Sequence, residues 1–146
     1  MPNTRKRQGT ASEHQVIGQL IDAGIDVYQT VVDDQGIDAV LRIDSGSDKA
    51  QYFDLQIKSS RTWSGIRGRI SALGKRENTV LILFNSTEHQ CLWFVAGEIE
   101  KEFPKTDLEF GDVFLKKDRV DEFLRESRGR LEKLRERLEE LKSSLC

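Results

Sequence analysis

The stretch FDLQIKSS, residues 53–60, alternates strictly between apolar and polar side chains. Positions 53, 55 and 57 are apolar, and positions 54, 56 and 58 are polar. This period of two is typical of a β-strand with one buried face. The polar face carries an amide, Gln56, and an ammonium, Lys58, followed at once by two serines. A solvated outer face would explain these residues if the stretch stood alone. The neighbouring segments are therefore needed to show whether this face has a function.

The segment just before this strand predicts its partner. GIDAVLRI (36–43) has the composition of a second strand, and DSGSDKA (44–50) that of a turn, so residues 36–60 are predicted to form a β-hairpin. With the turn centred on Ser47, Asp38 falls opposite Gln56, and Lys58 lies two residues further along the same face. A slip of one residue would separate these side chains. The predicted register therefore brings together a carboxylate, an amide oxygen and an ammonium.

The rest of the chain predicts an α/β fold. TASEHQVIGQLIDAG (10–24) is predicted to be a helix that stops at Gly24. Further strands are predicted at IDVYQTVV (25–32), TVLILFN (79–85) and QCLWFVA (90–96), a short helix near 66–73, and a short helix and strand within 97–115. A helix, a hairpin, a crossover and two more strands indicate a mixed central sheet flanked by helices.

The C-terminal segment has a different pattern. From Lys117 onward there is no proline, and apolar residues at 120, 124, 131, 134, 138, 141 and 145 follow a heptad spacing if Ser127 fills the missing position. A helix of about 28 residues would be roughly 42 Å long. We therefore predict a basic N-terminal arm (1–8), a folded domain (9–115) and a long amphipathic, coiled-coil helix (116–146). This helix is expected to pair chains into a homodimer or homotetramer; the alternative is a helix folded back on its own sheet.

Composition excludes several classes of protein. The chain has 146 residues, two distant cysteines and two histidines, which form no zinc or disulfide pattern. No apolar run approaches the roughly 18 residues that would span a membrane, so we predict a cytoplasmic protein with no membrane partner. The net charge is −2, yet the stretch from Leu55 to Arg76 holds six cations and no acidic residue. These cations could contact phosphates or simply be solvated.

Glu13 is the one carboxylate near the apolar stripe of the first predicted helix. At 100° per residue, Val16, Ile17, Leu20 and Ile21 form the stripe, and Glu13 projects close to its middle. Two interpretations remain open. Glu13 points toward the sheet, where a charge needs a partner or a metal, or it closes a capping box with Thr10.

These residues would suit phosphodiester hydrolysis. A divalent cation such as Mg²⁺ (or Mn²⁺) prefers hard oxygen ligands. Asp38 would be its anionic ligand, and the Gln56 side chain and the Ile57 carbonyl would supply two further oxygens. Lys58 would orient the water and stabilise negative charge at the phosphate. Glu13 would hold the metal through water, or a second metal directly.

Glu13, then GID with Asp38, then LQIKSS with Gln56 and Lys58, resembles the PD-(D/E)XK nuclease superfamily, especially its Holliday-junction-resolvase-like and intron-homing-endonuclease-like branches. The resemblance spans roughly residues 5–62. It implies a restriction-endonuclease-like sheet, a metal-dependent DNA endonuclease, and Glu13, Asp38, Gln56 and Lys58 as site residues. Gln56 departs from the usual Asp or Glu before x-Lys, which removes a charge and lowers the expected metal affinity.

The resemblance and the basic stretches together suggest which residues contact DNA. The expected contacts are Ser59, Ser60 and Arg61 after the motif, Arg67 and Arg69 beyond it, and Arg5, Lys6 and Arg7 near the start. Two alternatives to an endonuclease remain: a nucleic-acid-binding module of the same fold that has lost cleavage, and an interaction protein that works through the coiled coil.

Overall fold

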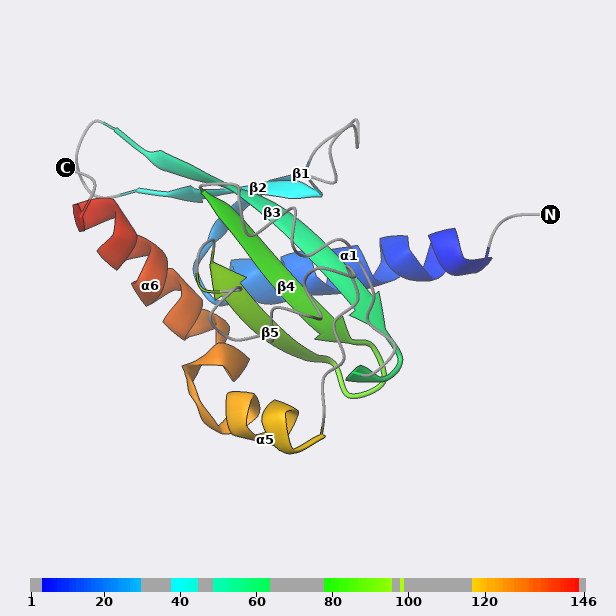
Figure 1. Ribbon diagram of the computed structural model, residues 1–146. Coiled ribbons are helices and arrows are strands. Elements are labelled where there is room, and N and C mark those ends of the chain that lie inside the picture. Colours follow the sequence, from blue (N-terminus) through cyan, green and yellow to red (C-terminus); the bar gives the residue numbers. More distant parts are fainter. Residues whose placement is uncertain are drawn as a thin grey trace.

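A computed structural model describes residues 4–29, 38–44, 49–63, 78–95, 98 and 117–144 of the chain, with side chains from residue 11 to residue 141 within these ranges. Their centre is a five-stranded sheet with the strands in chain order (Figure 1). The strands are β1 (Asp26–Gln29), β2 (Ala39–Ile43), β3 (Gln51–Ser60), β4 (Thr79–Asn85) and β5 (Gln90–Val95). Each strand coincides with a segment that its sequence pattern predicts.

The sheet is mixed. β1, β2 and β3 pair antiparallel, β3 and β4 pair parallel, and β4 and β5 pair antiparallel. In the hairpin, Ala39 pairs with Leu55 and Leu41 with Phe53. This is the predicted register, and in the described residues it holds as far as Ala39 and Leu55.

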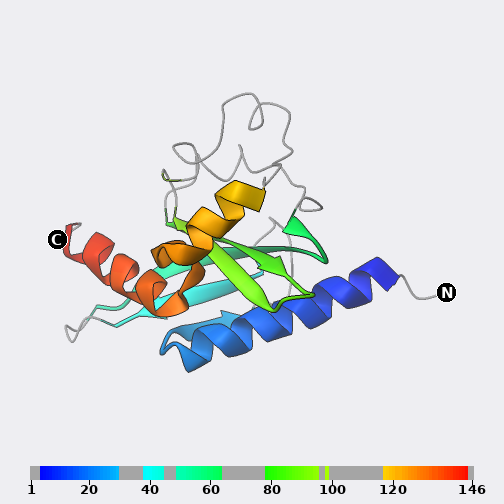
Figure 2. The same ribbon diagram turned by 90° about the horizontal axis from the view of Figure 1, so that it is seen from below.

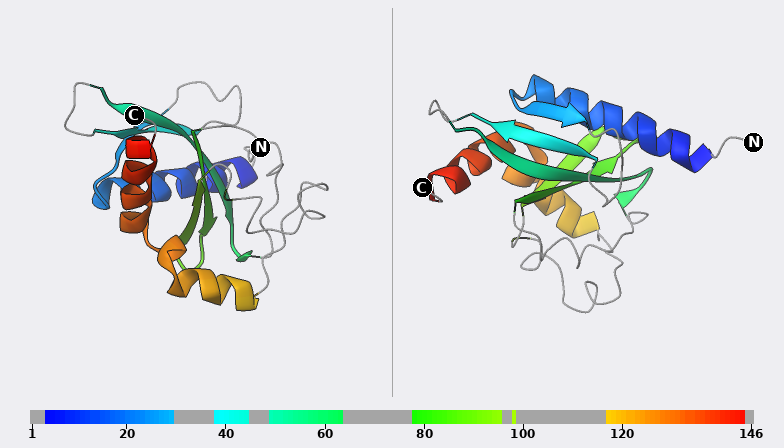
Figure 3. Two further views of the ribbon diagram at one scale, coloured as in Figure 1. Left: turned by 60° about the vertical axis from the view of Figure 1, so that its left-hand side comes forward. Right: turned by 90° about the horizontal axis from the view of Figure 1, so that it is seen from above.

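Helices cover both faces of the sheet (Figures 2 and 3). On one face, α1 (Thr4–Asp22) and α6 (Leu131–Ser144) bury the apolar positions of β2 and β3 together with Val16, Leu20 and Leu134. On the other face, α5 (Lys117–Arg125) packs Val120 and Phe123 against β4 and β5. Every residue of β4 is buried, as expected for a strand with helices on both sides.

Helix α1 differs from its prediction at its start. It ends as expected, with Gly24 in the left-handed region at φ +86, where glycine has no steric penalty. It begins at Thr4 rather than Thr10, so Thr10 lies inside the helix and the predicted capping box with Glu13 is wrong. Within the segment expected to be a basic arm, residues 1–8, residues 4–8 are helical backbone of α1.

The C-terminal segment is not one long helix, and this prediction is wrong. Helix α5 ends at Arg125, a 3₁₀ turn spans Ser127–Gly129, and α6 starts at Leu131. The break is stabilised by β5, because Trp93 Nε1 donates hydrogen bonds to the carbonyls of Ser127 and Arg130, both at 2.9 Å. A Cβ at Gly129 would approach the Leu124 backbone to 3.1 Å.

The apolar residues of the predicted heptad seam pack on the chain's own sheet. Leu131, Leu134 and Leu138 join the core shared with α1, and Val120 joins the core under α5. The alternative of a helical segment folded back on its own sheet is therefore the one observed. Pairing into a homodimer or homotetramer stays a prediction, without the long helix that motivated it.

Two predicted features lie outside the described residues: the short helix near 66–73, and the helix and strand within 97–115. No helix in the described part of the chain is long and apolar enough to cross a membrane.

Candidate functional site

Asp38 stands where β2 and β3 separate. Its backbone N–H donates to the Leu55 carbonyl at 2.9 Å, and its carboxylate oxygen Oδ2 accepts a hydrogen bond from the backbone N–H of Ile57 at 2.7 Å. Within the described ranges, β2 pairs with β3 only as far as Ala39 and Leu55. From Gln56 onward, β3 pairs with β4 alone. The Asp38 carboxylate thus takes the place of a backbone acceptor at the fork of the sheet.

The side-chain oxygen of Gln56 has no hydrogen-bond donor among the described residues. Gln56 follows Leu55, the last residue of β3 that pairs with β2 in the described ranges, and its side-chain oxygen Oε1 is buried. In a strand, the N–H and C=O of one residue point to the same side. Because the Ile57 N–H points to Asp38, the Ile57 carbonyl faces the same side of β3. The residues at this fork therefore carry a carboxylate, an amide oxygen and a carbonyl oxygen.

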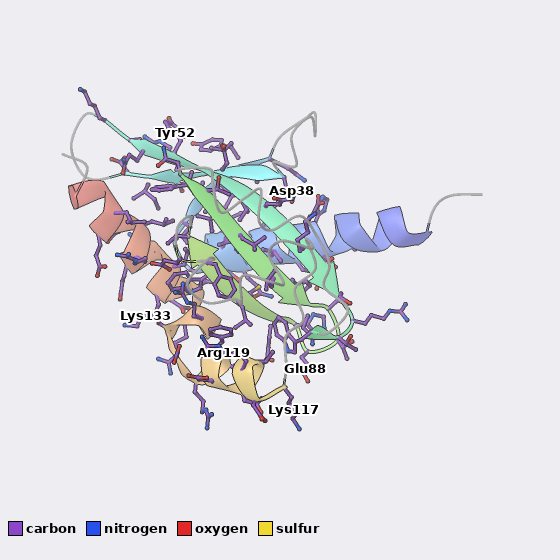
Figure 4. The ribbon with its side chains drawn as sticks, viewed as in Figure 1. Asp38, Tyr52, Glu88, Lys117, Arg119 and Lys133 are labelled. Carbon is purple, nitrogen blue, oxygen red and sulfur yellow. The ribbon has the colours of Figure 1, made fainter. Side chains whose placement is uncertain are left out.

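Lys58 lies on the same face of β3 as Gln56, half-buried and beside Leu83 of β4. Successive residues on one face of a strand are about 7 Å apart. The predicted grouping of Asp38, Gln56, Ile57 and Lys58 on adjoining parts of the sheet is thus present in the structure. Figure 4 shows Asp38 at the upper part of this region, beside β3.

Glu13 is placed differently from these four residues. The buried stripe of α1 runs through Ser12, Val16 and Leu20, and Ile21 is 56% exposed. Glu13 lies about 60° around the helix from Val16, so it is at the margin of the stripe rather than near its middle, and it is half-buried. Since α1 packs on the sheet face opposite Gln56 and Lys58, Glu13 would have to reach the metal past the end of β2.

The donor set has the chemistry of a magnesium site. Mg²⁺ prefers oxygen ligands, takes one or two carboxylates and keeps several waters. Asp38, Gln56 and the Ile57 carbonyl offer such oxygens, and an unpartnered buried oxygen costs free energy that a cation would recover. Among the residues that the structure describes, no three His, Cys, Asp or Glu side chains gather. A metal at the fork would thus rely on neutral oxygens beside Asp38.

The predicted DNA contacts follow the fork along β3. Ser59 and Ser60 are half-buried at the end of the strand, and Arg61 is exposed just after it. The backbone carbonyl of Ser60 accepts a hydrogen bond from the Ser86 N–H at 2.9 Å. Arg67 and Arg69, and the side chains of Arg5, Lys6 and Arg7, lie outside the described part of the structure.

A pocket that the sequence did not predict lies just beyond this end of β3. Its volume is about 520 Å³, and its wall includes Arg61, Trp63, Glu88 and Lys117. The other wall comes from α5, more than fifty residues away in the chain. No local pattern could have placed Lys117 beside Arg61, because only the packing of α5 on the sheet does so.

No protein-family model matches this chain, and neither a search of curated proteins nor a search of solved structures finds a similar protein.

Proposed function

We propose that this protein is a metal-dependent DNA endonuclease with a site at the fork between β2 and β3. The observation that carries this proposal is the buried Gln56 Oε1, which has no partner among the described residues and belongs to the residue just before Ile57, whose N–H donates to the Asp38 carboxylate. Two other buried oxygens, Gln51 Oε1 and Thr79 Oγ1, also lack partners. Gln56 differs from them because the next residue, Ile57, donates its N–H to the Asp38 carboxylate, and Lys58 follows on the same face of β3.

The mixed sheet with helices on both faces also supports the proposal. Resemblance to the PD-(D/E)XK superfamily implies an aspartate at the start of one strand and the x-Lys motif on its antiparallel neighbour. Asp38 and the Gln56-x-Lys58 segment of β3 fit this arrangement. The restriction-endonuclease-like fold is part of the same proposal.

Each residue at the fork has a separate task in the proposed reaction. Asp38, Gln56 and the Ile57 carbonyl would hold Mg²⁺ or Mn²⁺, with Glu13 assisting through water. The bound cation would neutralise charge at the scissile phosphate and acidify a water molecule. Lys58 would orient the attacking water and stabilise the negative charge that develops on the phosphate oxygens.

A second function is favoured by one specific observation. The Asp38 carboxylate accepts the Ile57 N–H at 2.7 Å, which is a structural task that needs no metal. A nucleic-acid-binding module without cleavage would keep this bond. The substitution Asp38→Asn separates the two functions, because the amide retains an oxygen for the Ile57 N–H and loses the charge.

The test uses the full chain with supercoiled plasmid, linear duplex and a four-way junction, each with Mg²⁺, Mn²⁺ or EDTA. We expect metal-dependent nicking or cleavage of at least one substrate. Asp38→Asn should lower the rate by about 100-fold or more, with DNA binding retained in a gel-shift assay and the melting temperature nearly unchanged.

Lys58→Met is the second variant, since it keeps much of the aliphatic stem of the lysine and removes the ammonium. It should also lose cleavage while folding normally. Cleavage that is equal in wild type and Asp38→Asn would reject the proposed site. DNA binding without cleavage in any metal would favour the inactive module.

A further inference from the structure

The pocket beyond the end of β3 is formed by three separate parts of the chain. Arg61 and Trp63 follow β3, Glu88 belongs to the turn between β4 and β5, and Lys117 and Asp121 come from α5. Figure 4 shows Glu88 and Lys117 at this end of the molecule, near one another but on different elements. At about 520 Å³, the pocket has the size of a small-ligand site.

Trp63 gives the pocket a flat apolar wall. The ring is half-buried and packs against the core that α5 covers, and Val120 and Leu124 continue the apolar lining. Part of Trp63 therefore covers the core, and part of it faces the pocket. A flat group that enters could stack on the indole, as nucleobases do on aromatic side chains.

The charges of the pocket point to a nucleotide. Arg61 and Lys117 are cations suited to a phosphate, and Glu88 and Asp121 are carboxylates that would repel one. Adenine, cytosine and guanine each carry an exocyclic amino group, which donates hydrogen bonds to carboxylates. One nucleotide has both chemistries, so it fits the mixed charges better than a phosphate group alone.

The pocket lies on the same face of the sheet as the proposed site. Gln56 and Lys58 are on the face that α5 covers further along, and three residues separate Lys58 from Arg61, about 10 Å of strand. A DNA strand with its scissile phosphate at Lys58 would therefore bring a nearby nucleotide to the pocket.

We propose that this pocket binds an unpaired nucleobase of the DNA substrate, stacked on Trp63, with a flanking phosphate near Arg61 and Lys117. This proposal rests on the proposed nuclease for the identity of the strand. It implies a substrate with single-stranded or unpaired nucleotides close to the cleavage point, because a base inside a duplex is already stacked and paired.

The test measures binding in EDTA, so it does not depend on cleavage. A single-stranded oligodeoxycytidylate of about eight nucleotides is titrated into the protein, and a fully paired duplex of equal length serves as the comparison. The single strand should quench tryptophan emission, because Trp93 is only 3% exposed and Trp63 is the accessible ring. Trp63→Leu keeps an apolar side chain against the core, and should abolish the quenching and weaken binding about tenfold.

Two further variants check the assignment. Trp63→Phe retains a ring, so its affinity should stay within about threefold of wild type. Tyr52→Ala is the matched control: Tyr52 is 54% exposed on the same sheet face, at the other end of β3, and its loss should not change binding. Far-UV circular dichroism of each variant establishes that it is folded.

The possible failures are distinct. Single-strand binding by folded Trp63→Leu at wild-type affinity, or equally tight binding of the paired duplex, would overturn the proposed pocket even if cleavage occurs. Quenching that is lost in Trp63→Leu, in a protein that never cleaves DNA, would support the pocket and reject the nuclease.

Discussion

At the scale of single residues, Gln56 decides how strongly a metal is held. A glutamine oxygen can coordinate a cation but brings no charge, so among the proposed ligands at the fork Asp38 supplies the negative charge. Gln56 Oε1 is buried without a donor in the described structure. Without a bound metal, the desolvation of this oxygen therefore lowers the stability of the folded protein.

Gln56→Glu should therefore lower the stability of the protein without metal and strengthen its binding of Mg²⁺. Without metal, a second carboxylate beside Asp38 is buried and repelled, so the melting temperature in EDTA should fall by several degrees. With excess Mg²⁺ the loss should be recovered, and the affinity for Mg²⁺ should rise about tenfold or more over wild type. Differential scanning fluorimetry and isothermal titration calorimetry measure the two effects.

Gln51→Glu is the matched control for this prediction. Gln51 lies on the same strand, and its Oε1 is also buried without a partner in the described part of the protein, but it pairs with Ile43, away from Asp38. The control should be destabilised and should not be rescued by Mg²⁺. Equal rescue of both variants, or of neither, would argue against a metal at the fork.

At the scale of elements, the joint between the C-terminal helices and β5 is held by polar contacts between side chains distant in the sequence. Arg128 pairs with Glu98 at 2.6 Å, and its guanidinium lies 4.9 Å from the centre of the Trp93 ring. Arg137 of α6 pairs with the same Glu98 at 2.9 Å. These contacts surround the two carbonyls that Trp93 binds, so they fix the angle between α5 and α6.

Arg128→Met should destabilise the protein by about 1–3 kcal/mol, because it removes a largely buried ion pair and a cation–π contact while Arg137 still pairs with Glu98. Urea unfolding measures the change. Lys133→Met is the control, since the ion pair of Lys133 with Glu136 is on the exposed side of α6, and such pairs contribute less than about 1 kcal/mol. A loss no larger than that of the control would show that the joint depends on Trp93 alone.

At the scale of the whole molecule, folding buries a titratable group that has no part in the proposed site. Cys91 of β5 is buried in the core under α1, with its thiol 3.5 Å from the Gln19 side-chain oxygen. Burial raises the pKa of this thiol to about 12. In the unfolded chain the pKa is near 8.5, so the thiolate is far more favourable there than in the folded protein.

The sign of the pH dependence follows from this difference. The protonated thiol is the form that the folded state favours, so its contribution to stability is complete below about pH 8.5 and is lost as the pH rises toward 12. The unfolding free energy of wild type relative to Cys91→Ala should fall by up to about 1.4 kcal/mol per pH unit in this range. Urea unfolding of both proteins from pH 7.5 to 10.5 measures it, and parallel curves would contradict the prediction.

The sequence by itself determined the strands and the hairpin. Alternation at 51–60, the apolar run at 79–85 and the turn around Ser47 are local patterns. The period of two fixes the face on which Phe53 and Leu55 are buried, and the turn selects the pairing with β2. That register was enough to place Asp38 just beyond the last pair of β2 with β3, and Gln56 and Lys58 on one face of β3. The local sequence also determined where α1 ends, because the helix stops at Gly24, which adopts a positive φ.

Only the tertiary structure decided where the helices lie. The heptad spacing after Lys117 was compatible with a coiled coil and with packing on the chain's own sheet, because both bury the same apolar face. Trp93, from another part of the chain, binds the two carbonyls at the break and turns α6 onto the sheet. Tertiary packing also forms the pocket between Trp63 and α5, and it places Glu13 at the margin of the buried stripe of α1. Both features depend on contacts between segments that no local pattern relates.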